Sequence, residues 1–386
     1  MKIPMSEPDI TAVEREAVAA VLETPTLALG PRLVGFEERL ASYVGARHAI
    51  GVSSGTAGLH LCVLAAGVEP NDLVITSPFS FVASANCILY AGARPVFVDV
   101  DPDTLTLDPD AVARCVARLD RSPHRGRLRA LLPVHVFGHA AEMGSLLVVA
   151  ERYGLAVIED ACEAIGAEYC GRPVGSIGDA GVFAFYPNKQ MTTGEGGMIV
   201  TDDDAWDPLF RSLRNQGRDV FDAWLTHSRL GYNYRLSELA AALGEAQLGR
   251  LDGILARRER VAGWYAARLG DCEGITLPAR AWWATRISWF VYVVRLRVAG
   301  DRDRVMRGLE RRGIPARPYF PPIHLQPFYR ARFDHRPGEF PVAEAAGASC
   351  LALPFFAGMR EEQVDAVCGA LHEVLVERAP VRRAFA

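Results

Sequence analysis

The sequence lacks the patterns that mark several classes of protein. Its eight cysteines are scattered, and no two are separated by only two residues, which argues against a zinc or redox motif. No apolar stretch reaches membrane-spanning length, and the first ten residues contain no apolar signal core. The net charge is −4, and no basic run precedes the short tail at 378–383. We therefore expect a cytoplasmic protein with neither a membrane nor a nucleic acid as partner.

The sequence also gives little support for a metal-binding site. One histidine pair, His135 and His139, has the i, i+4 spacing of metal ligands on a helix. The residues around it, PVHVFGH, are typical of a strand that ends in a turn, where this spacing does not bring two side chains together. We expect no metal site.

The first 200 residues alternate between short apolar runs and helical stretches. Half of the chain is apolar and 23% is charged, as in ordinary globular proteins. Strands are predicted at 48–53, 73–77, 95–100, 130–136, 155–159, 181–185 and 198–201. Helices are predicted at 7–22, 31–44, 57–66, 83–90, 108–117 and 141–153. This alternation favours an α/β fold with a mostly parallel, seven-stranded sheet between helices, whose ligand lies at the carboxyl ends of the strands.

The pattern changes in the last third of the chain. Helices are predicted at 203–215 and 236–270, with an irregular segment at 221–236 between them. A strand at 286–297, helices at 301–312, 342–350 and 360–377, and a proline-rich loop at 315–324 follow. We expect a large α/β domain over residues 1–250 and a smaller α+β domain over residues 251–386.

The most informative stretch is GVFAFYPNKQMTTGEGG at 181–197. A buried strand that runs into a glycine-rich loop holds one side chain, Lys189, at its end. Desolvation of a lysine by apolar neighbours lowers its pKa, and a shift from about 10.4 to about 7 costs the charged form about 4 kcal/mol. Such a lysine can form a Schiff base with a carbonyl and act as a base when released. A solvated loop lysine is the alternative.

A second strand end has the character of an anion site. Gly55, Thr56 and Ala57 follow the strand at 48–53 and open the next helix. The N–H groups at a helix start attract an anion, and glycine lets a phosphate approach closely. A plain N-cap is the alternative interpretation.

Two further strand ends add to this pattern. Asp160 ends the strand at 155–159, and a buried carboxylate needs a partner such as a pyridinium N–H; an N-cap or salt bridge would serve equally. Phe81 follows the strand at 73–77 and could stack on a flat heteroaromatic ring, although a core position is the common role of phenylalanine. A phosphate cup, a stacking ring, a carboxylate and a lysine at strand ends together define a pocket for pyridoxal 5'-phosphate.

One hypothesis from a different class starts from the same residues. Gly51–Gly55 also matches G-x-S-x-G, the nucleophile elbow of α/β-hydrolases, with Ser53 as the nucleophile. Asp160 would supply the acid, and His324 or His372 the histidine. This hypothesis leaves Lys189 and its glycine-rich loop without a role.

Longer motifs carry a resemblance to a known family. The segments SSGTAGLHL, PVFVDVD, VIEDACEAIGA, YPNKQMTTGEGG, LRNQGR and GYNYRLSELAAALGEAQL occur in the order found in DegT/StrS-type aminotransferases. The chain resembles that family over nearly its whole length. The resemblance implies a fold type I pyridoxal-phosphate enzyme that acts mostly on nucleotide-linked keto sugars.

The resemblance also implies roles for particular residues. Lys189 would form the Schiff base and move the proton, and Asp160 would pair with the pyridine nitrogen. The other implied cofactor-binding residues are Gly55, Thr56 and Ala57 at the phosphate, Phe81 at the ring face, Glu163 at the phenolic oxygen, and Asn233, which reaches the phosphate of the partner subunit's cofactor. A homodimer with shared active sites follows from the last role.

The sequence departs from the family pattern at two positions. Ala184 stands where many members have a phosphate-binding serine, and Asn188 or Tyr186 are the candidates to replace that contact. Glu163 stands where glutamine or histidine is common, and a carboxylate beside an anionic phenolate is unfavourable unless one of them carries a proton. Some relatives replace the lysine with histidine and perform dehydration, so the presence of Lys189 favours transamination.

We therefore expect a ping-pong transamination from L-glutamate to a keto sugar. Arg235 and Arg317 are candidates for binding the donor carboxylate or a diphosphate, because the guanidinium fork suits both; surface salt bridges are their alternative role. Tyr186, Tyr319 and His324 are candidates for contacting the sugar. A keto-cyclitol acceptor, or a cofactor-binding regulator without turnover, are the alternatives.

Overall fold

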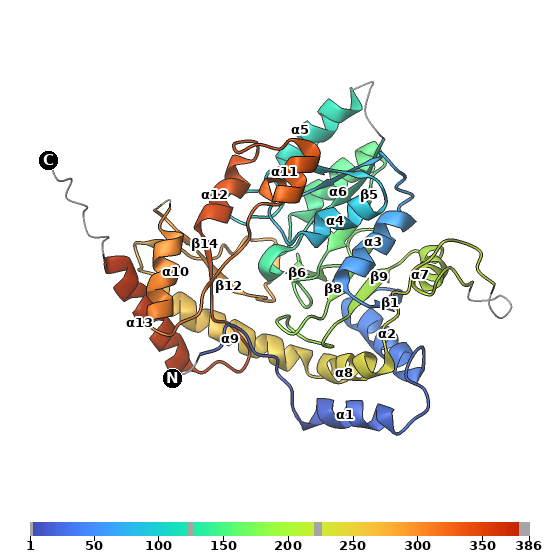
Figure 1. Ribbon diagram of the computed structural model, residues 1–386, viewed down its shortest axis with the longest axis horizontal. Coiled ribbons are helices and arrows are strands. Elements are labelled where there is room, and N and C mark those ends of the chain that lie inside the picture. Colours follow the sequence, from blue (N-terminus) through green and yellow to red (C-terminus); the bar gives the residue numbers. More distant parts are fainter. Residues whose placement is uncertain (1–2, 122–126, 220–225, 299, 378–386) are drawn as a thin grey trace.

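The protein is described from a computed structural model, which covers residues 3–121, 127–219, 226–298 and 300–377 (Figure 1). The basic tail at 378–383 and the residues 220–225, next to and within the predicted irregular segment, lie outside the described residues. Among the described residues, no helix combines the length and apolar character needed to cross a membrane.

A seven-stranded sheet forms the centre of the first two-thirds of the chain, in the order β1-β9-β8-β5-β4-β2-β3. The pairs β2/β3, β2/β4, β4/β5 and β5/β8 are parallel, whereas β9 is antiparallel to both β1 and β8. Six strands therefore share one direction, and the predicted mostly parallel sheet is confirmed. The strands are β1 (His48–Val52), β2 (Leu73–Thr76), β3 (Arg94–Phe97), β4 (Leu128–Leu132), β5 (Ala156–Asp160), β8 (Ala180–Ala184) and β9 (Gly197–Thr201).

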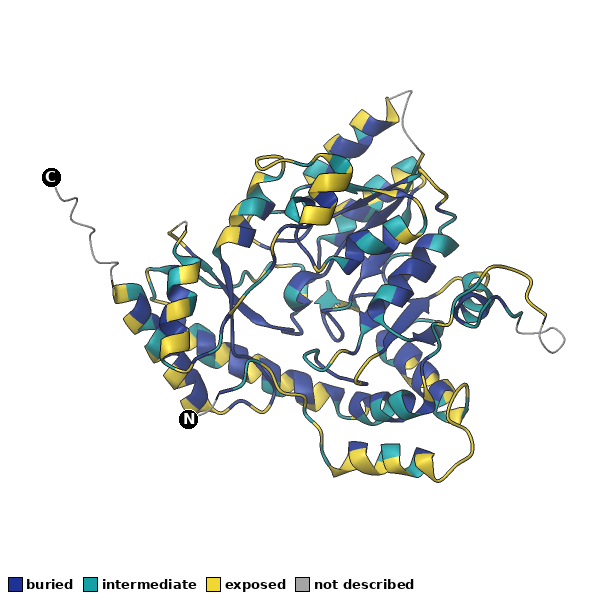
Figure 2. Cartoon of the chain, viewed as in Figure 1, coloured by how far each residue is buried: buried dark blue, intermediate teal, exposed yellow. Residues whose placement is uncertain are grey.

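Helices cover both faces of this sheet, because successive side chains of its strands point to opposite sides. In β9, for example, Val200 packs into one core and Ile199 into the other. The first core contains residues of α2 (Pro31–Val44), α5 (Pro109–Asp120), α6 (Met143–Tyr153) and α8 (Glu238–Leu248). The second contains residues of α3 (Gly55–Ala65), α4 (Ala83–Tyr90) and α7 (Trp206–Arg214). Figure 2 shows the strands and the inner helix faces as buried.

A smaller sheet, in the order β10-β12-β14-β13, lies in the C-terminal third. Its strands are β10 (Ile275–Thr276), β12 (Tyr292–Leu296), β13 (Arg317–Pro318) and β14 (Cys350–Leu353), and its core includes residues of α9 (Leu251–Leu269), α10 (Arg302–Arg311) and α13 (Glu361–Val376). A third sheet consists of β6 (Glu168–Tyr169), β7 (Arg172–Pro173) and β11 (Ala284–Arg286). Ile3, near the start of the chain, packs into the C-terminal core, and the Phe355 N–H donates to the Met5 carbonyl. The division at residue 250 stays a prediction.

The structure corrects three predicted elements. The strand at 286–297 is interrupted, because Trp289 adopts a positive φ of 50° between β11 and β12. The helix at 236–270 is two helices, α8 and α9, separated at Gly249 and Arg250. The first helix, α1 (Ala12–Leu22), begins five residues later than predicted, because Thr11 and Glu14 form a capping box there. The short α11 (Pro327–Phe333) was not predicted, and α12 is Pro341–Ser349.

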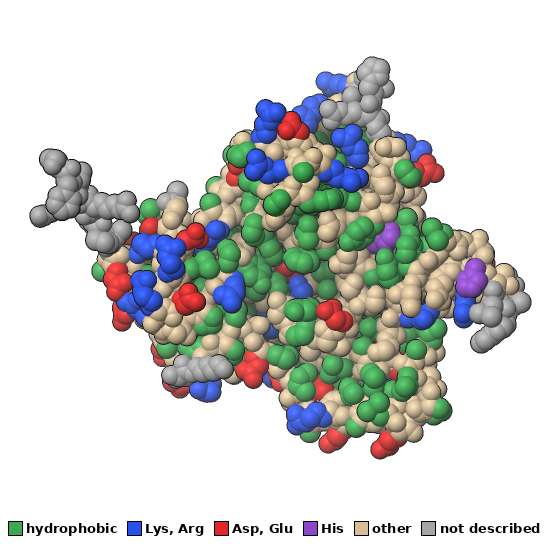
Figure 3. Space-filling view, in the orientation of Figure 1, with side chains coloured by type: hydrophobic (Ala, Val, Ile, Leu, Met, Phe, Trp, Pro, Cys, Tyr) green, Lys and Arg blue, Asp and Glu red, His purple; other side chains and the backbone are tan. Residues whose placement is uncertain are grey.

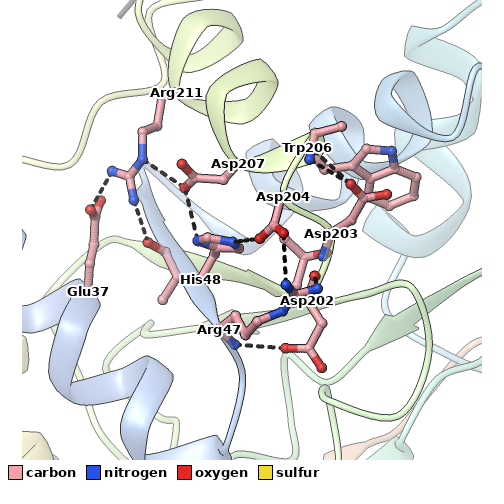
Figure 4. Close-up of polar contacts among 12 residues, drawn as sticks. Glu37, Arg47, His48, Asp202, Asp203, Asp204, Trp206, Asp207 and Arg211 are labelled. Atoms are coloured by element: carbon pink, nitrogen blue, oxygen red, sulfur yellow. Dashed lines mark hydrogen bonds and ion pairs between the residues drawn. The ribbon is translucent and has the colours of Figure 1, made fainter.

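A buried carboxylate ties the start of the sheet to two helices. Glu37 of α2 accepts hydrogen bonds from the Gly51 N–H of β1 at 2.8 Å, from Arg211 at 2.7 Å and from Arg214. Figure 4 shows Arg211 between Glu37 and Asp207, beside the more exposed network of Arg47, His48 and Asp204. Glu37 therefore fixes the strand that leads into the first helix of the candidate site.

We expect Glu37→Gln to lower the free energy of unfolding by about 3 kcal/mol, because it leaves the buried Arg214 guanidinium without its anion, while Arg211 keeps its ion pair with Asp207. The midpoint of urea denaturation measures this change. Arg39→Gln is the matched control on the same helix: its ion pair with Glu245 is exposed on the arginine side, so we expect a loss of at most about 1 kcal/mol. Equal effects of the two substitutions would contradict this account.

Candidate active site

A cavity of about 510 Å³ lies at the carboxyl ends of the strands of the large sheet. The ends of β1, β4, β5 and β8 and the loop after β2 all contribute to its wall. Eight of the thirteen residues predicted for the site line this cavity: Gly55, Thr56, Phe81, Asp160, Glu163, Tyr186, Lys189 and Tyr319. The sheet therefore brings together residues that are up to about 260 positions apart in the chain, as the strand-end rule predicts.

Lys189 lies five residues after the end of β8, and its side chain is 12% exposed. Its Nζ lies 3.6 Å from Glu163 Oε1 and 3.8 Å from the centroid of the Phe290 ring. A carboxylate and an aromatic face both attract an ammonium group, so together they hold this amine in one place.

The backbone around this amine is held by a buried arginine. The guanidinium of Arg258, on α9, donates to the carbonyls of Lys189 at 3.0 Å, Trp289 at 3.0 Å and Phe290 at 3.3 Å. Burial lowers the pKa of Arg258 to about 10. One side chain of the C-terminal part thus fixes both the lysine and the ring beneath its amine.

Asp160 is the last residue of β5 and is buried. The Ser84 hydroxyl, on α4, donates to its Oδ2 at 2.6 Å, and the Cys162 N–H donates to its Oδ1 at 3.1 Å. Because both donors are neutral, they orient the carboxylate without cancelling its charge. The negative charge remains directed at the cavity that Asp160 lines.

The start of α3 has the free N–H groups that the predicted anion site requires. The N–H groups of Gly55 and Thr56, at the first two helical positions, have no intrahelical acceptor. A Cβ on Gly55 would lie 2.8 Å from the Cβ of Ala184, which is too close. Glycine is therefore the residue that fits at the start of α3, and residue 184 is its direct neighbour. Ala57 is a correction: it does not line the cavity, because the Ser54 hydroxyl caps its N–H at 3.1 Å.

Asn188 is a further polar group in the wall of the same cavity. It lines the cavity, and its buried Oδ1 has no hydrogen-bond partner among the described residues. A buried amide without a partner is expected to bind a ligand or a water, and its two ends can exchange by a rotation of the side chain. Of the two side chains predicted to replace the missing serine contact, Asn188 has the unmet hydrogen-bonding capacity.

Glu163 is buried against the same cavity. Burial raises its pKa, and the Lys189 charge and the Phe137 N–H, which donates at 2.9 Å, oppose that shift. This carboxyl group is therefore easier to protonate than an ordinary glutamate.

Besides Ala57, four more predicted residues lie outside this chain's own cavity. His324 is a correction: it is fully buried, its Nε2 lies 3.1 Å from Glu344, and it does not line the cavity. The Arg235 guanidinium donates to Asn215 and Gln216 at 2.9 Å, and Arg317 points its guanidinium at the Ala316 carbonyl. Asn233 is exposed.

The hydrolase hypothesis fails on geometry. The Asp160 carboxylate is bound by Ser84 and Cys162, His324 by Glu344, and His372 lies on α13, so none of the histidines that the structure describes joins Ser53 to an acid. The histidine pair flanks a short 3-10 helix, Val136–Gly138, and the two rings have different partners: His135 bonds to Glu159 at 2.9 Å, and His139 to the Ala140 carbonyl at 2.8 Å. Burial lowers the pKa of His139 to about 4. No group of three potential metal ligands occurs in the described part of the chain.

Sequence reasoning missed three residues that shape the site: Ser84, Arg258 and Phe290. A signal existed for Arg258, because it falls on the apolar face of α9 together with Ile254, Val261 and Tyr265, where a charge is unexpected. Neither Ser84 nor Phe290 had a comparable signal, since serine and phenylalanine are ordinary at those places.

The residues of the cavity fit pyridoxal 5'-phosphate. A helix start and an unpartnered amide suit the phosphate, a buried carboxylate suits a protonated ring nitrogen, and a nearly buried amine suits the aldehyde. The fold and this site define a fold type I aminotransferase that depends on pyridoxal phosphate.

Comparison with known proteins gives the family. The model of the DegT/DnrJ/EryC1/StrS aminotransferase family matches residues 8–372, and the chain belongs to this family. GDP-perosamine synthase of Caulobacter vibrioides is 40% identical over 381 residues, which cover 97% of this chain and 99% of that protein. The crystal structure of S. venezuelae DesV is 35% identical with a TM-score of 0.89, covering 98% of this chain and all of that one. A putative sugar aminotransferase from Streptococcus pneumoniae in its PMP form is 25% identical with a TM-score of 0.89, covering 97% and 99%.

The position of Glu163 leads to a prediction about pH. In Glu163→Gln, the carboxylate 3.6 Å from Lys189 is lost. An anion at that distance favours the protonated form of a nearby nitrogen, so its removal should lower the pH midpoint of the holoenzyme's visible absorbance change by about one unit. Absorbance spectra between pH 5 and 9 measure this midpoint. Tyr186→Phe, a neutral change in the same cavity, is the control, and an unchanged midpoint in Glu163→Gln would contradict the role of the charge.

Proposed function

We propose that the protein transfers the amino group of L-glutamate to a keto sugar linked to a nucleotide, with a 4-keto or 3-keto deoxysugar as the acceptor. The observation that carries this proposal is the convergence of Lys189 and Asp160 on one cavity with an anion-binding helix start. The name of the Caulobacter relative, GDP-perosamine synthase, supports a nucleotide-linked amino sugar as the product.

Each residue has a task in this reaction. Pyridoxal phosphate, when bound, withdraws electrons from the substrate carbon that loses its proton. Lys189 takes this proton and returns it at the adjacent position, and the Glu163 carboxyl and Phe290 ring hold its amine in reach. Asp160 keeps a proton on the ring nitrogen by its charge, and the Gly55 and Thr56 N–H groups hold the phosphate.

The amino group then passes to the second substrate by the same steps in reverse. Both half-reactions use the same lysine, which explains why one cavity suffices for two substrates. A keto-cyclitol is the alternative acceptor, since the carbonyl chemistry is the same. Tyr186 and Tyr319 line the cavity and are the candidates for contacting either acceptor.

A homodimer with shared active sites is part of the proposal. Asn233 is exposed and does not line its own chain's cavity, as expected if it serves the cavity of a second copy. Arg235 and Arg317, also outside the cavity, could reach the partner's substrate in the same way. A cytoplasmic location stays a prediction.

Mixing two inactive variants tests the shared sites. If Asn233 acts across the interface, chains with Lys189→Ala and chains with Asn233→Ala should form mixed dimers with one intact site, and activity should return on mixing. Activity that stays absent after the chains exchange would count against sharing.

The first test of the function is spectroscopic. The purified holoenzyme should absorb visible light, and this absorbance should fall when L-glutamate is added. GDP-, UDP- and dTDP-linked keto sugars and free keto-cyclitols are then added one at a time. The acceptor should restore the visible absorbance, and we expect the nucleotide-linked sugars to restore it fastest. A holoenzyme whose absorbance does not change with any amino donor would overturn the proposal. If only cyclitols restore the absorbance, the acceptor is a keto-cyclitol and not a nucleotide-linked sugar.

A further inference from the structure

A second cavity, of about 900 Å³, lies beside the candidate active site. Phe81, Tyr319 and Phe320 line both cavities and form the boundary between them. We call the second one the side cavity; its other walls come from α4, the loop at 321–326 and α11. A substrate whose reacting carbon lies beside Lys189, and which is too large for the first cavity, would extend past Tyr319 into the side cavity.

Flat aromatic surfaces dominate the side cavity. Phe81, Tyr90 and Phe328 line it, and each residue is more than half exposed, at 60%, 54% and 55%. Figure 3 shows hydrophobic side chains gathered between α11 and α4, bordered by basic ones. Open aromatic faces stack on nucleobases, and such stacking needs no particular base.

Polar groups occupy the same walls. Asn86 accepts a hydrogen bond from the Tyr329 hydroxyl at 2.7 Å through its Oδ1, so its amide nitrogen remains as a donor. Gln326 adds an amide that can both donate and accept, whereas the buried Ser80 hydroxyl already bonds to the Phe81 carbonyl and to the Ser84 hydroxyl, both at 3.1 Å. This combination of a stacking surface with a few amide and hydroxyl groups is the usual composition of a small-molecule site, and the volume falls within the usual range of about 300–1,000 Å³.

One positive charge stands at the edge of these rings. The Arg332 guanidinium of α11 lies 5.9 Å from the centroid of the Phe328 ring and lines the side cavity. Within the described ranges, no carboxylate forms an ion pair with it. An arginine that is not neutralised by an acid is suited to a phosphate or diphosphate, which its fork can bind through two hydrogen bonds.

We propose that the side cavity binds the nucleoside diphosphate part of the acceptor, with the base against the ring of Phe328 and the diphosphate at Arg332. This inference rests on the proposed function, because it assumes that the sugar reacts beside Lys189. Contacts far from the reacting carbon then contribute to turnover, since they orient the sugar for the amine. A keto sugar without its nucleotide would lose this contribution.

The experiment compares Phe328→Ala and Arg332→Ala with wild-type holoenzyme. Binding of GDP, UDP and dTDP is measured by calorimetry, and kcat/KM is measured for the nucleotide-linked keto sugar that the acceptor panel selects. We expect both variants to weaken binding of the preferred diphosphate and to lower kcat/KM by about tenfold. Arg330→Ala is the matched control, because it removes the same charge from the same helix outside the cavity lining. It should behave as wild type.

The half-reaction with glutamate, which needs only the first cavity, is the internal reference. If the wild-type holoenzyme does not react with glutamate, the proposed function fails and this inference fails with it. If it reacts, but none of the three diphosphates binds or both variants keep wild-type affinity and kcat/KM, the side cavity is not the subsite and the proposed function stands. If Phe328→Ala instead changes the sedimentation of the protein, a second copy covers the cavity and the inference is overturned.

Discussion

Replacing Lys189 with alanine should abolish amino transfer, with kcat falling by about 10⁴-fold or more, because the chain loses the base that moves the substrate proton. The visible absorbance of the holoenzyme should change at the same time, since the amine that meets the cofactor's aldehyde is gone. Stopped-flow absorbance with L-glutamate measures both effects. A variant that still reacts within tenfold of wild type would remove Lys189 from the mechanism.

The composition of the chain provides a clean control for this experiment. Of 42 basic residues, only two are lysines, Lys2 and Lys189. Reduction of the wild-type holoenzyme with borohydride should therefore attach the cofactor to one internal peptide, which mass spectrometry can identify. Lys2→Arg should leave both the labelling and the activity unchanged, whereas labelling at Lys2 would contradict the assignment.

The second large effect is expected for Asp160→Asn, which keeps the shape of the side chain and removes its charge. We expect kcat to fall by about 10³-fold, because the ring nitrogen loses the anion that keeps it protonated, and a preorganised electrostatic partner in a buried site has an effect of this size. Ser84→Ala isolates the hydrogen bond from the charge.

That control removes the 2.6 Å hydrogen bond to Asp160 and leaves the carboxylate in place. Loss of one hydrogen bond corresponds to about 1 kcal/mol, so kcat should fall only about fivefold. Similar losses in the two variants would mean that the geometry of Asp160, rather than its charge, is what the reaction needs.

Much of this fold was predictable because its signals are local. Each predicted strand of the large sheet overlaps an observed one, since a buried parallel strand is a short apolar run between turn residues. The C-terminal third was harder to predict. Trp289 adopts a left-handed backbone conformation that interrupts an otherwise continuous apolar run, and only tertiary packing favours it there.

The residues of the site also fall into two groups: those that local sequence signals predict and those whose place depends on tertiary contacts. Asp160 and Lys189 were predictable because they follow strands, and the ends of parallel strands meet at one edge of a sheet. His324 was predicted to face a sugar because it belongs to a proline-rich loop, but its ring turns into the core to meet Glu344. The direction in which a loop side chain points depends on contacts distant in sequence, and this is also why Phe290 escaped notice.

The bond between Arg258 and the Lys189 carbonyl limits how this protein can be recombined with its relatives. Chimeras built to change acceptor preference would naturally place the crossover at residue 250, where α9 is about to begin. With such a crossover, Lys189 comes from one parent and residue 258, which binds the Lys189 carbonyl, comes from the other. A crossover beyond Leu269 keeps both partners of this bond from one parent. The incoming sheet must still accommodate Ile3 and Met5 of the resident chain, which pack against it from the other end of the sequence.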